Sequence, residues 1–334
     1  MPTRRDMIGL VAAAGIGAVS QTGRAQSMQP LKIVAFAGAS NLPFWVGQER
    51  GLFQREGVEP ALEITPNSVE MAKALHDGRY DLALTSVDNI VAYDEGQGEA
   101  ALAGPADFVA LFGVDNGMLS VMAAPDIGSV AALKGRTVSV DAMTTGFAFV
   151  LREMLARNGL AEGDVTFMRV GGGAQRLAAL LQGDQAATLL NTPLDLVAEA
   201  KGFRRLARAC DTPGAYQGIV AATRRGVVDR LRRPLAGFTR GFHAAVSWLA
   251  DGANRDETVA LLTRRIPGME RPQAERAYAA LLDPVEGLYR DLRIDGDGLR
   301  TVLRLRSAYA RPQRDLADPA RYIDATFLGD ALKG

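Results

Sequence analysis

The side chains that most often perform acid–base or nucleophilic chemistry are scarce in this sequence. The chain has two histidines, His76 and His243, and a single cysteine, Cys210. Both histidines fall within segments of helical periodicity, where a structural histidine is more common than a catalytic base. Cys210 has no histidine near it in the sequence, and a lone cysteine is usually a core residue. We therefore predict no catalytic residues and no enzymatic activity.

Sequence motifs for metal ions and phosphate groups are also missing. The chain has no cluster of Cys and His with metal-ligand spacing, no Gly-Lys phosphate loop and no Gly-x-Ser-x-Gly turn. The segment DGDG, which begins at Asp295, resembles the start of a calcium loop. Its twelfth position is Arg306, where a bidentate glutamate is required. We therefore expect neither a metal nor a cofactor.

Small polar residues recur at the ends of the strand-like segments. They could hydrogen-bond a small molecule, and the helix N-termini that follow them add unpaired N–H groups. Helix capping is an equally good interpretation for Asn67, Asp88, Asp141 and Thr192, because these residue types are common N-caps. The predicted ligand-binding residues are Ser40, Asn41, Phe44, Trp45, Ser68, Ser86, Asp88, Asp115, Asn116, Thr144, Thr145, Gly172, Asn191 and Tyr216.

Two adjacent aromatic residues, Phe44 and Trp45, follow the first apolar run, LKIVAFA. A loop after a strand reaches the edge of the sheet where ligands bind in open parallel sheets. Phe44 or Trp45 could therefore form a wall of a ligand site, with Ser40 and Asn41 as hydrogen-bonding partners. The alternative is that both rings only pack the first helix onto the sheet.

Three acidic residues, Asp88, Asp115 and Asp141, lie at predicted strand ends, and the nearest strand-end loops contain no Lys or Arg. A small inorganic or sulfonate anion would usually find a cation in its site. Helix N-termini can hold an anion without one, so an anionic ligand stays open. The composition of these loops favours a neutral or cationic polar molecule with a flat ring.

Strand-like and helix-like segments alternate in two successive rounds along the chain. Such alternation predicts parallel sheets covered by helices, so we predict an α/β fold of two lobes with a ligand cleft between them. Two crossing strands, near residues 115–119 and 211–218, join the lobes. We assign residues 31–116 and 217–334 to the first lobe and residues 117–216 to the second. From about Gly226 only helices are evident, and this tail is expected to pack on the first lobe.

Composition and charge limit the class of partner. Apolar residues make up 48% of the 334 residues, which is enough for a core of normal size. The formal net charge is zero, and no long block of one sign occurs, so nucleic acid is not an expected partner. We expect a monomer.

The first 25 residues resemble an export signal. Arg4 and Arg5 precede an apolar stretch, residues 8–19, and small residues at Gly23 and Ala25 provide a cleavage site. Twelve apolar residues are too short to span the ~30 Å hydrocarbon core of a membrane. The arginine pair resembles a twin-arginine signal, and the general secretory route stays open because the residues that follow depart from that pattern.

Several phrases of the sequence resemble the substrate-binding proteins of ABC importers. These phrases are PFWVGQERGLFQREGVEPALEI, AKALHDGRYDLALTS, APDIGSVAALKGRTVSV and VLREMLARNGLAEGDVTFMRV, and the likeness spans about residues 31–225. The group includes receptors for nitrate, alkanesulfonates and thiamine-precursor pyrimidines. The resemblance implies two α/β lobes with a solute between them, a periplasmic location, a small-molecule ligand and an ABC permease as partner.

Two other function classes stay open. The same fold hosts enzymes, among them a desulfinase with a cleft cysteine in the first lobe and a pyrimidine synthase with a cysteine-rich segment. This chain has only Cys210, in the second lobe. A sensory protein that presents its closed form to a receptor is the third possibility. The sequence does not name the ligand.

Overall fold

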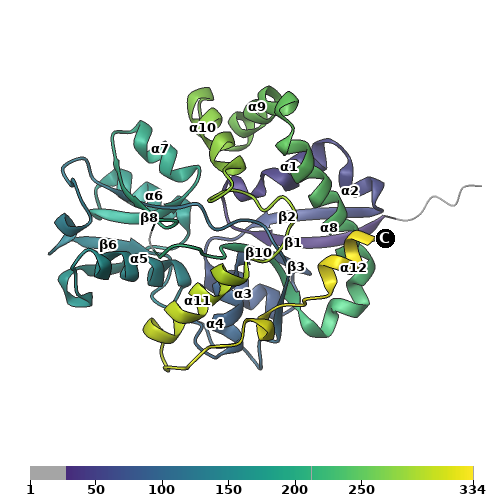
Figure 1. The fold of residues 1–334 in the computed structure, drawn as a ribbon, viewed down its shortest axis with the longest axis horizontal. Coiled ribbons are helices and arrows are strands. Elements are labelled where there is room, and N and C mark those ends of the chain that lie inside the picture. The colour runs from purple at the N-terminus through teal and green to yellow at the C-terminus, as the bar shows by residue number, and fades with distance from the viewer. Residues whose placement is uncertain (1–27, 212, 334) are drawn as a thin grey trace, which may run out of the picture.

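The computed structural model describes residues 28–211 and 213–333, which form two α/β lobes side by side (Figure 1). The predicted export signal, residues 1–25, lies outside the described residues. The first sheet has the strand order β2 (Val58–Ile64), β1 (Gln29–Ala35), β3 (Leu82–Ser86), β10 (Ile219–Arg224) and β4 (Phe108–Gly113). The second has the order β7 (Thr166–Arg169), β6 (Thr137–Val140), β8 (Ala187–Asn191), β5 (Leu119–Ala123) and β9 (Arg204–Arg208). The predicted fold class is confirmed.

The two sheets share one topology. In the first sheet β1 runs parallel to β2 and β3, and β10 is antiparallel to its neighbours β3 and β4. In the second sheet β6 runs parallel to β7 and β8, and β5 is antiparallel to β8 and β9. The carboxyl ends of the parallel strands of each sheet therefore meet at one edge, which is where α/β sheets bind ligands.

Helices cover both sheets. Those of the first lobe are α1 (Leu42–Glu49), α2 (Leu52–Arg55), α3 (Ser68–His76) and α4 (Val87–Asp94), and those of the second are α5 (Gly146–Arg157), α6 (Gly173–Gln182) and α7 (Leu194–Ala200). Every residue of β3, β4 and β5 is buried, as expected for strands with helices or loops on both faces. The mostly apolar sequences of these strands, LALTS, FVALFG and LSVMA, have this cause.

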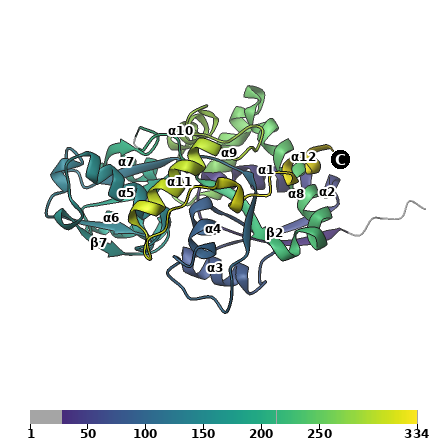
Figure 2. The same cartoon turned by 60° about the horizontal axis from the view of Figure 1, so that its bottom comes forward.

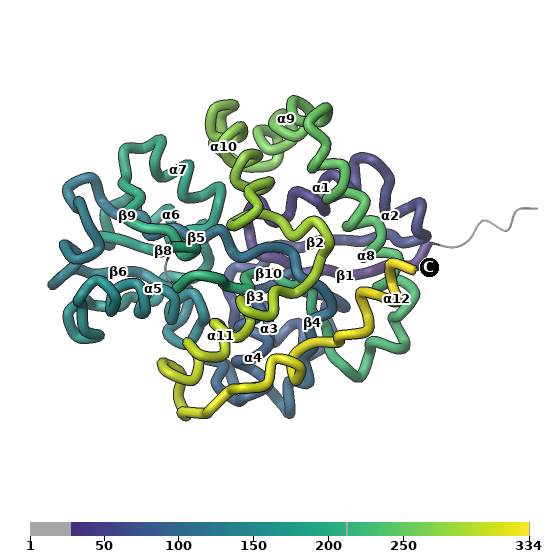
Figure 3. The backbone as a smooth tube through the Cα atoms, viewed as in Figure 1, coloured from purple at the N-terminus to yellow at the C-terminus, as the bar shows by residue number. Residues whose placement is uncertain are grey.

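Two segments cross between the lobes, and they run side by side at the centre of the molecule (Figure 3). Residues 114–118 join β4 to β5, and residues 209–218 join β9 to β10. Gly218 donates its N–H to the Asp115 carbonyl at 3.1 Å. A Cβ atom at Gly218 would overlap the amide nitrogen of Gly117, so only glycine permits this close approach.

The C-terminal helices reach both lobes. They are α8 (Val228–Ala250), α9 (Arg255–Arg265), α10 (Arg271–Leu282), α11 (Gly296–Tyr309) and α12 (Phe327–Lys333). Helix α8 packs on α1, α2, β1 and β2, and α12 packs on α8, as predicted for a tail on the first lobe. Two tail helices also contact the second lobe, because α10 touches α7 and α11 lies between α4 and α5 (Figure 2). No helix in the described part of the chain is long and apolar enough to cross a membrane.

Candidate ligand-binding site

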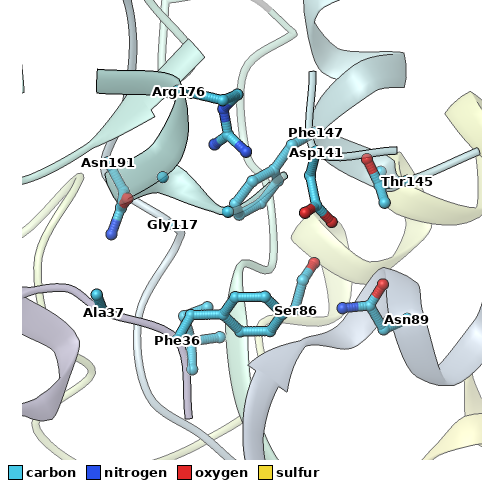
Figure 4. A pocket seen from close by; sticks show the side chains of 14 residues that line it. Phe36, Ala37, Ser86, Asn89, Gly117, Asp141, Thr145, Phe147, Arg176 and Asn191 are labelled. Atoms are coloured by element: carbon cyan, nitrogen blue, oxygen red, sulfur yellow. The ribbon is translucent and has the colours of Figure 1, made fainter. Parts of the chain in front are cut away.

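A pocket lies between the two lobes at the ends of the parallel strands (Figure 4). The space between its lining residues, counted together with space open to solvent, is about 600 Å³. Its lining residues are Phe36, Ala37, Ser86, Asn89, Gly117, Asp141, Thr145, Gly146, Phe147, Gly172, Gly173, Arg176, Asn191 and Ile219. They come from both lobes and include Gly117 of the first crossing segment and Ile219 at the start of β10, so the pocket has the position that the strand-end argument predicts for a ligand.

Four of the predicted ligand-binding residues line this pocket: Ser86, Thr145, Gly172 and Asn191. Ser86 and Asn191 end β3 and β8, and Thr145 and Gly172 lie in the loops after β6 and β7, so both sheets are represented. The other ten predicted residues lie outside the lining, and most of them contact or support residues that belong to it.

Phe44 and Trp45 belong to α1, and the structure places them in the packing of the first lobe. Phe44 is buried, with its ring centroid 5.6 Å from that of Phe53 and 6.4 Å from that of Phe238 on α8. Trp45 is partly buried against the same core. The packing alternative therefore describes both side chains, because α1 needs an apolar face against α8.

The aromatic walls of the pocket are Phe36 and Phe147 instead. Phe36 follows β1 in the first lobe, and Phe147 lies in the first turn of α5 in the second lobe. Figure 4 shows the two rings on different sides of the pocket. Asn41 donates its Nδ2 hydrogen to the Phe36 carbonyl at 2.7 Å, so this predicted residue supports a wall from behind.

Asp115 and Asn116 belong to the first crossing segment, and Ser40 hydrogen-bonds to Asp115. Asp115 is fully buried, and its Oδ1 atom accepts hydrogen bonds from the N–H groups of Gly117 at 2.7 Å and Ile219 at 3.4 Å. Burial raises the pKa of Asp115 to about 6, while the hydrogen bond from Ser40 opposes that shift. Asn116 donates to the Val285 carbonyl at 2.5 Å. These side chains hold the first crossing segment and the start of β10, which carry the pocket residues Gly117 and Ile219.

Asp88 is neutralised within the protein and does not line the pocket. Arg306 on α11 donates to both of its carboxylate oxygens, at 2.8 and 2.6 Å, and both side chains are fully buried. The same guanidinium donates to the Thr144 carbonyl at 2.8 Å. Tyr216 is buried beside Phe147, with ring centroids 6.5 Å apart, and burial raises its pKa. Asp88, Thr144 and Tyr216 therefore lie behind the pocket wall.

Ser68 and Asp141 connect the two lobes at the pocket. The Ser68 hydroxyl, at the start of α3, donates to Asp141 Oδ2 at 2.5 Å. The other carboxylate oxygen, Oδ1, is buried and has no hydrogen-bond partner among the described residues. Of the residues for which capping was the alternative, Asn67 caps α3 by accepting from the Glu70 N–H at 2.9 Å, and Asp141 lines the pocket.

Arg176 is a charged pocket residue that the sequence analysis did not identify. Its side chain is 4% exposed, and its guanidinium donates only to backbone carbonyls, those of Leu189 at 3.0 and 3.2 Å and Gly171 at 2.6 Å. Burial lowers its pKa, and the negative charge of Asp141 opposes that shift. The inference that no cation stands near the strand ends is therefore corrected. Arg176 lies one turn into α6, beyond the loop residues on which that inference rests.

The lining supplies hydrogen-bond donors, acceptors, one cation and two aromatic walls. It contains no His, Cys or Lys. Within residues 28–211 and 213–333, no group of three or more His, Cys, Asp or Glu side chains could hold a metal ion. These groups are suited to the recognition of a small polar molecule.

Several solved structures have a fold similar to that of this chain. The periplasmic nitrate-binding protein NrtA from Synechocystis PCC 6803 is 13% identical with a TM-score of 0.76, and the match covers 92% of this chain and 89% of that chain. The ligand-binding component of an ABC-type import system from Staphylococcus aureus is 15% identical with a TM-score of 0.73, with coverage of 91% and 99%. The desulfurization enzyme DSZB is 15% identical with a TM-score of 0.63, and coverage is again 91% and 99%.

The sequence comparisons agree with the resemblance found in the sequence. No curated protein sequence matches the chain. The profile of the NMT1-like family matches residues 25–263, which is more than half of the chain. The structural neighbours include a ligand-binding component of an ABC-type import system, an alkanesulfonate-binding protein and a periplasmic nitrate-binding protein, so the predicted resemblance is confirmed. The chain belongs to the NMT1-like family.

Proposed function

We propose that this protein is an extracytoplasmic receptor that captures a small molecule in the pocket between its lobes and delivers it to an ABC permease. The observation that carries the proposal is the pocket itself, which is lined from both lobes and contains the buried Arg176 and Asp141. One structural neighbour is named as the ligand-binding component of an ABC-type import system and another as a periplasmic nitrate-binding protein, which supports the same role.

Closure of the lobes is part of this proposal. We assign residues 31–116 with 217–334 to one lobe and residues 117–216 to the other, with the two crossing segments as the hinge. A ligand that binds both lobes has a higher affinity for the closed form and shifts the population toward it. The closed form would then be recognised by the permease.

The test is to purify the protein from the extracytoplasmic fraction and analyse it by native mass spectrometry. We expect a protein-bound small molecule, or binding of one component when the emptied protein is incubated with a metabolite extract. We also expect the mature chain to begin at or near Gln26, since residues 1–25 have the features of an export signal. A native chain that retains Met1 or Pro2, or that binds no small molecule, would contradict this function.

An enzymatic role is the alternative to consider, because one neighbour is a desulfurization enzyme. Cys210 does not line the pocket, and burial raises the pKa of its thiol to about 12. At neutral pH the thiol is therefore protonated, and a thiol is a much weaker nucleophile than a thiolate. Recovery of an altered molecule after incubation would favour the enzyme.

A further inference from the structure

We infer that the ligand is a small zwitterion whose anionic group binds Arg176 and whose protonated amine binds Asp141. This inference rests on the proposed receptor function and names the class of its ligand. It is carried by two oppositely charged side chains that are both buried in the pocket lining and are not paired with each other.

The cation, Arg176, is available to an anionic group. Among the ion pairs of the described residues none includes Arg176, and its hydrogen bonds use three of its five N–H groups. Figure 4 shows the guanidinium directed into the pocket. The N-terminus of α6 lies beside it, and its N-cap residue is Gly172, which has no side chain with which to cap the helix. An uncapped helix N-terminus and an arginine fork both favour an anion at this point.

The anion, Asp141, is available to a donor. Its exposed fraction is 7%, and Oδ1 is left without a hydrogen-bond partner while Ser68 occupies Oδ2. A buried carboxylate oxygen without a donor has a large desolvation penalty. A protonated amine at Oδ1 would remove this penalty, and it would provide a charge-assisted hydrogen bond.

The other acidic residues near the pocket do not compete for this role. Asp88 is paired with Arg306, and Asp115 accepts backbone hydrogen bonds and lies outside the lining. The charged side chains of the lining are therefore one cation and one anion. A simple anion would leave Asp141 unpaired, and a simple amine would leave Arg176 unpaired, whereas a zwitterion satisfies both.

The two aromatic side chains set the shape of the ligand between its charges. Phe36 and Phe147 approach the pocket from different lobes. A short apolar or flat body between the charged groups would contact both rings in the closed form. The ligand class is thus a compact zwitterion with an apolar or aromatic spacer.

Matched probes test the class by titration calorimetry on the emptied mature protein. One series is 4-(aminomethyl)benzoate with its single-charge analogues 4-methylbenzoate and 4-methylbenzylamine. The second series is β-alanine with propanoate and propylamine. We expect the zwitterion of at least one series to bind at least tenfold more tightly than both of its analogues. Equal binding by a single-charge analogue, or no binding by either zwitterion, would overturn the inference.

Variants identify the two charges. Asp141→Asn should lower zwitterion affinity to that of the matched anion and leave anion binding within about twofold. Arg176→Gln should lower zwitterion affinity to that of the matched amine and leave amine binding within about twofold. Arg176→Lys keeps the positive charge and should retain part of the zwitterion affinity. It serves as the second test if Arg176→Gln folds poorly. Arg136→Gln is the control, because Arg136 is an exposed partner of Asp126 outside the pocket. Equal weakening of all probes by both pocket variants would contradict the inference.

Failure of the zwitterion assignment can be told apart from failure of the receptor function. If both zwitterions fail while native mass spectrometry finds another bound solute, the receptor function stands and the ligand class is wrong. If the protein binds no component of a metabolite extract, the receptor function itself is wrong.

Discussion

At the scale of single residues, the ion pair between Arg306 and Asp88 is almost completely buried. Both carboxylate oxygens are paired, and the guanidinium also reaches the Thr144 carbonyl and lies 5.0 Å from the centre of the Phe149 ring. Such a pair matters most when one partner is removed, because the other charge then stays buried without compensation.

Arg306→Gln is expected to lower the free energy of unfolding by about 3–5 kcal/mol, because Asp88 would remain buried and unpaired. Urea denaturation at neutral pH measures this change. The control is Arg271→Gln, because Arg271 forms exposed ion pairs with Asp256 and Glu275, and their loss should change stability by less than about 1 kcal/mol. Similar losses in both variants would contradict this account of the buried pair.

Asp115 makes the stability of the protein depend on pH. An aspartate in an unfolded chain ionises near pH 3.9, whereas burial raises the pKa of folded Asp115 to about 6. Between these two values the folded state binds more protons, so the free energy of unfolding falls as the pH rises from about 4 to 6. Over this pH range, the ionisation of this one carboxyl group lowers the free energy of unfolding by roughly 2–3 kcal/mol.

Asp115→Asn should remove this contribution. The stability of the wild type relative to the variant should fall as the pH rises through that window and stay constant above it. Chemical denaturation of both proteins at several pH values gives the difference. A difference that does not change between pH 4 and 6 would show that Asp115 ionises normally in the folded state.

At the scale of elements, the strand–helix alternation was sufficient to predict both sheets and the edge where the pocket lies. The prediction of individual side chains was weaker, because a residue type does not show whether it faces the pocket or the core. Phe44 and Phe36 illustrate this, since both are aromatic residues near the end of β1 and only Phe36 lines the pocket. Arg176 was missed because it lies within α6 and not in a strand-end loop. An arginine in a helix is usually exposed, so the sequence pattern did not indicate that this one is buried at the pocket.

The loop before α6 joins the lobes at the pocket. The Gly172 N–H donates to the Pro66 carbonyl of the first lobe at 3.1 Å. A Cβ atom at Gly172 would lie 2.7 Å from that same oxygen, which is closer than a real contact permits. The absence of a side chain at this position therefore allows the closed arrangement.

Gly172→Ala should disfavour the closed form and weaken ligand binding by tenfold or more, with little change in secondary structure. Gly163→Ala is the matched control, because a Cβ atom at Gly163 would meet nothing within 4 Å. Titration calorimetry with the ligand found by mass spectrometry gives both affinities. Equal affinities in the two variants would show that Gly172 does not limit closure.

At the scale of the whole molecule, the lobes are in contact on several sides. Direct hydrogen bonds between the lobes include Ser68 to Asp141 at 2.5 Å, Gly172 to Pro66 at 3.1 Å and Ala39 to Thr192 at 3.2 Å. The described conformation therefore has the contacts of a closed form. Empty protein in solution is expected to populate a more open form, in which these contacts are broken.

Small-angle X-ray scattering should report this change as a smaller radius of gyration when ligand is added. Circular dichroism should stay constant, because the lobes move as units. Gly172→Ala with ligand should keep the larger radius of the empty protein. If the radius does not change although binding is established independently, the pocket is rigid and the hinge proposal is wrong.

Helix α11 has a consequence for how long a bound solute stays. It lies between α4 and α5, and Arg306 and Tyr309 on it bind Thr144 and Glu153 of the second lobe. The lobes can separate only if α11 slides over or releases its contacts with either α5 or α4. The height of that barrier sets the dissociation rate, so substitutions on α11 that never touch the solute are expected to change its residence time.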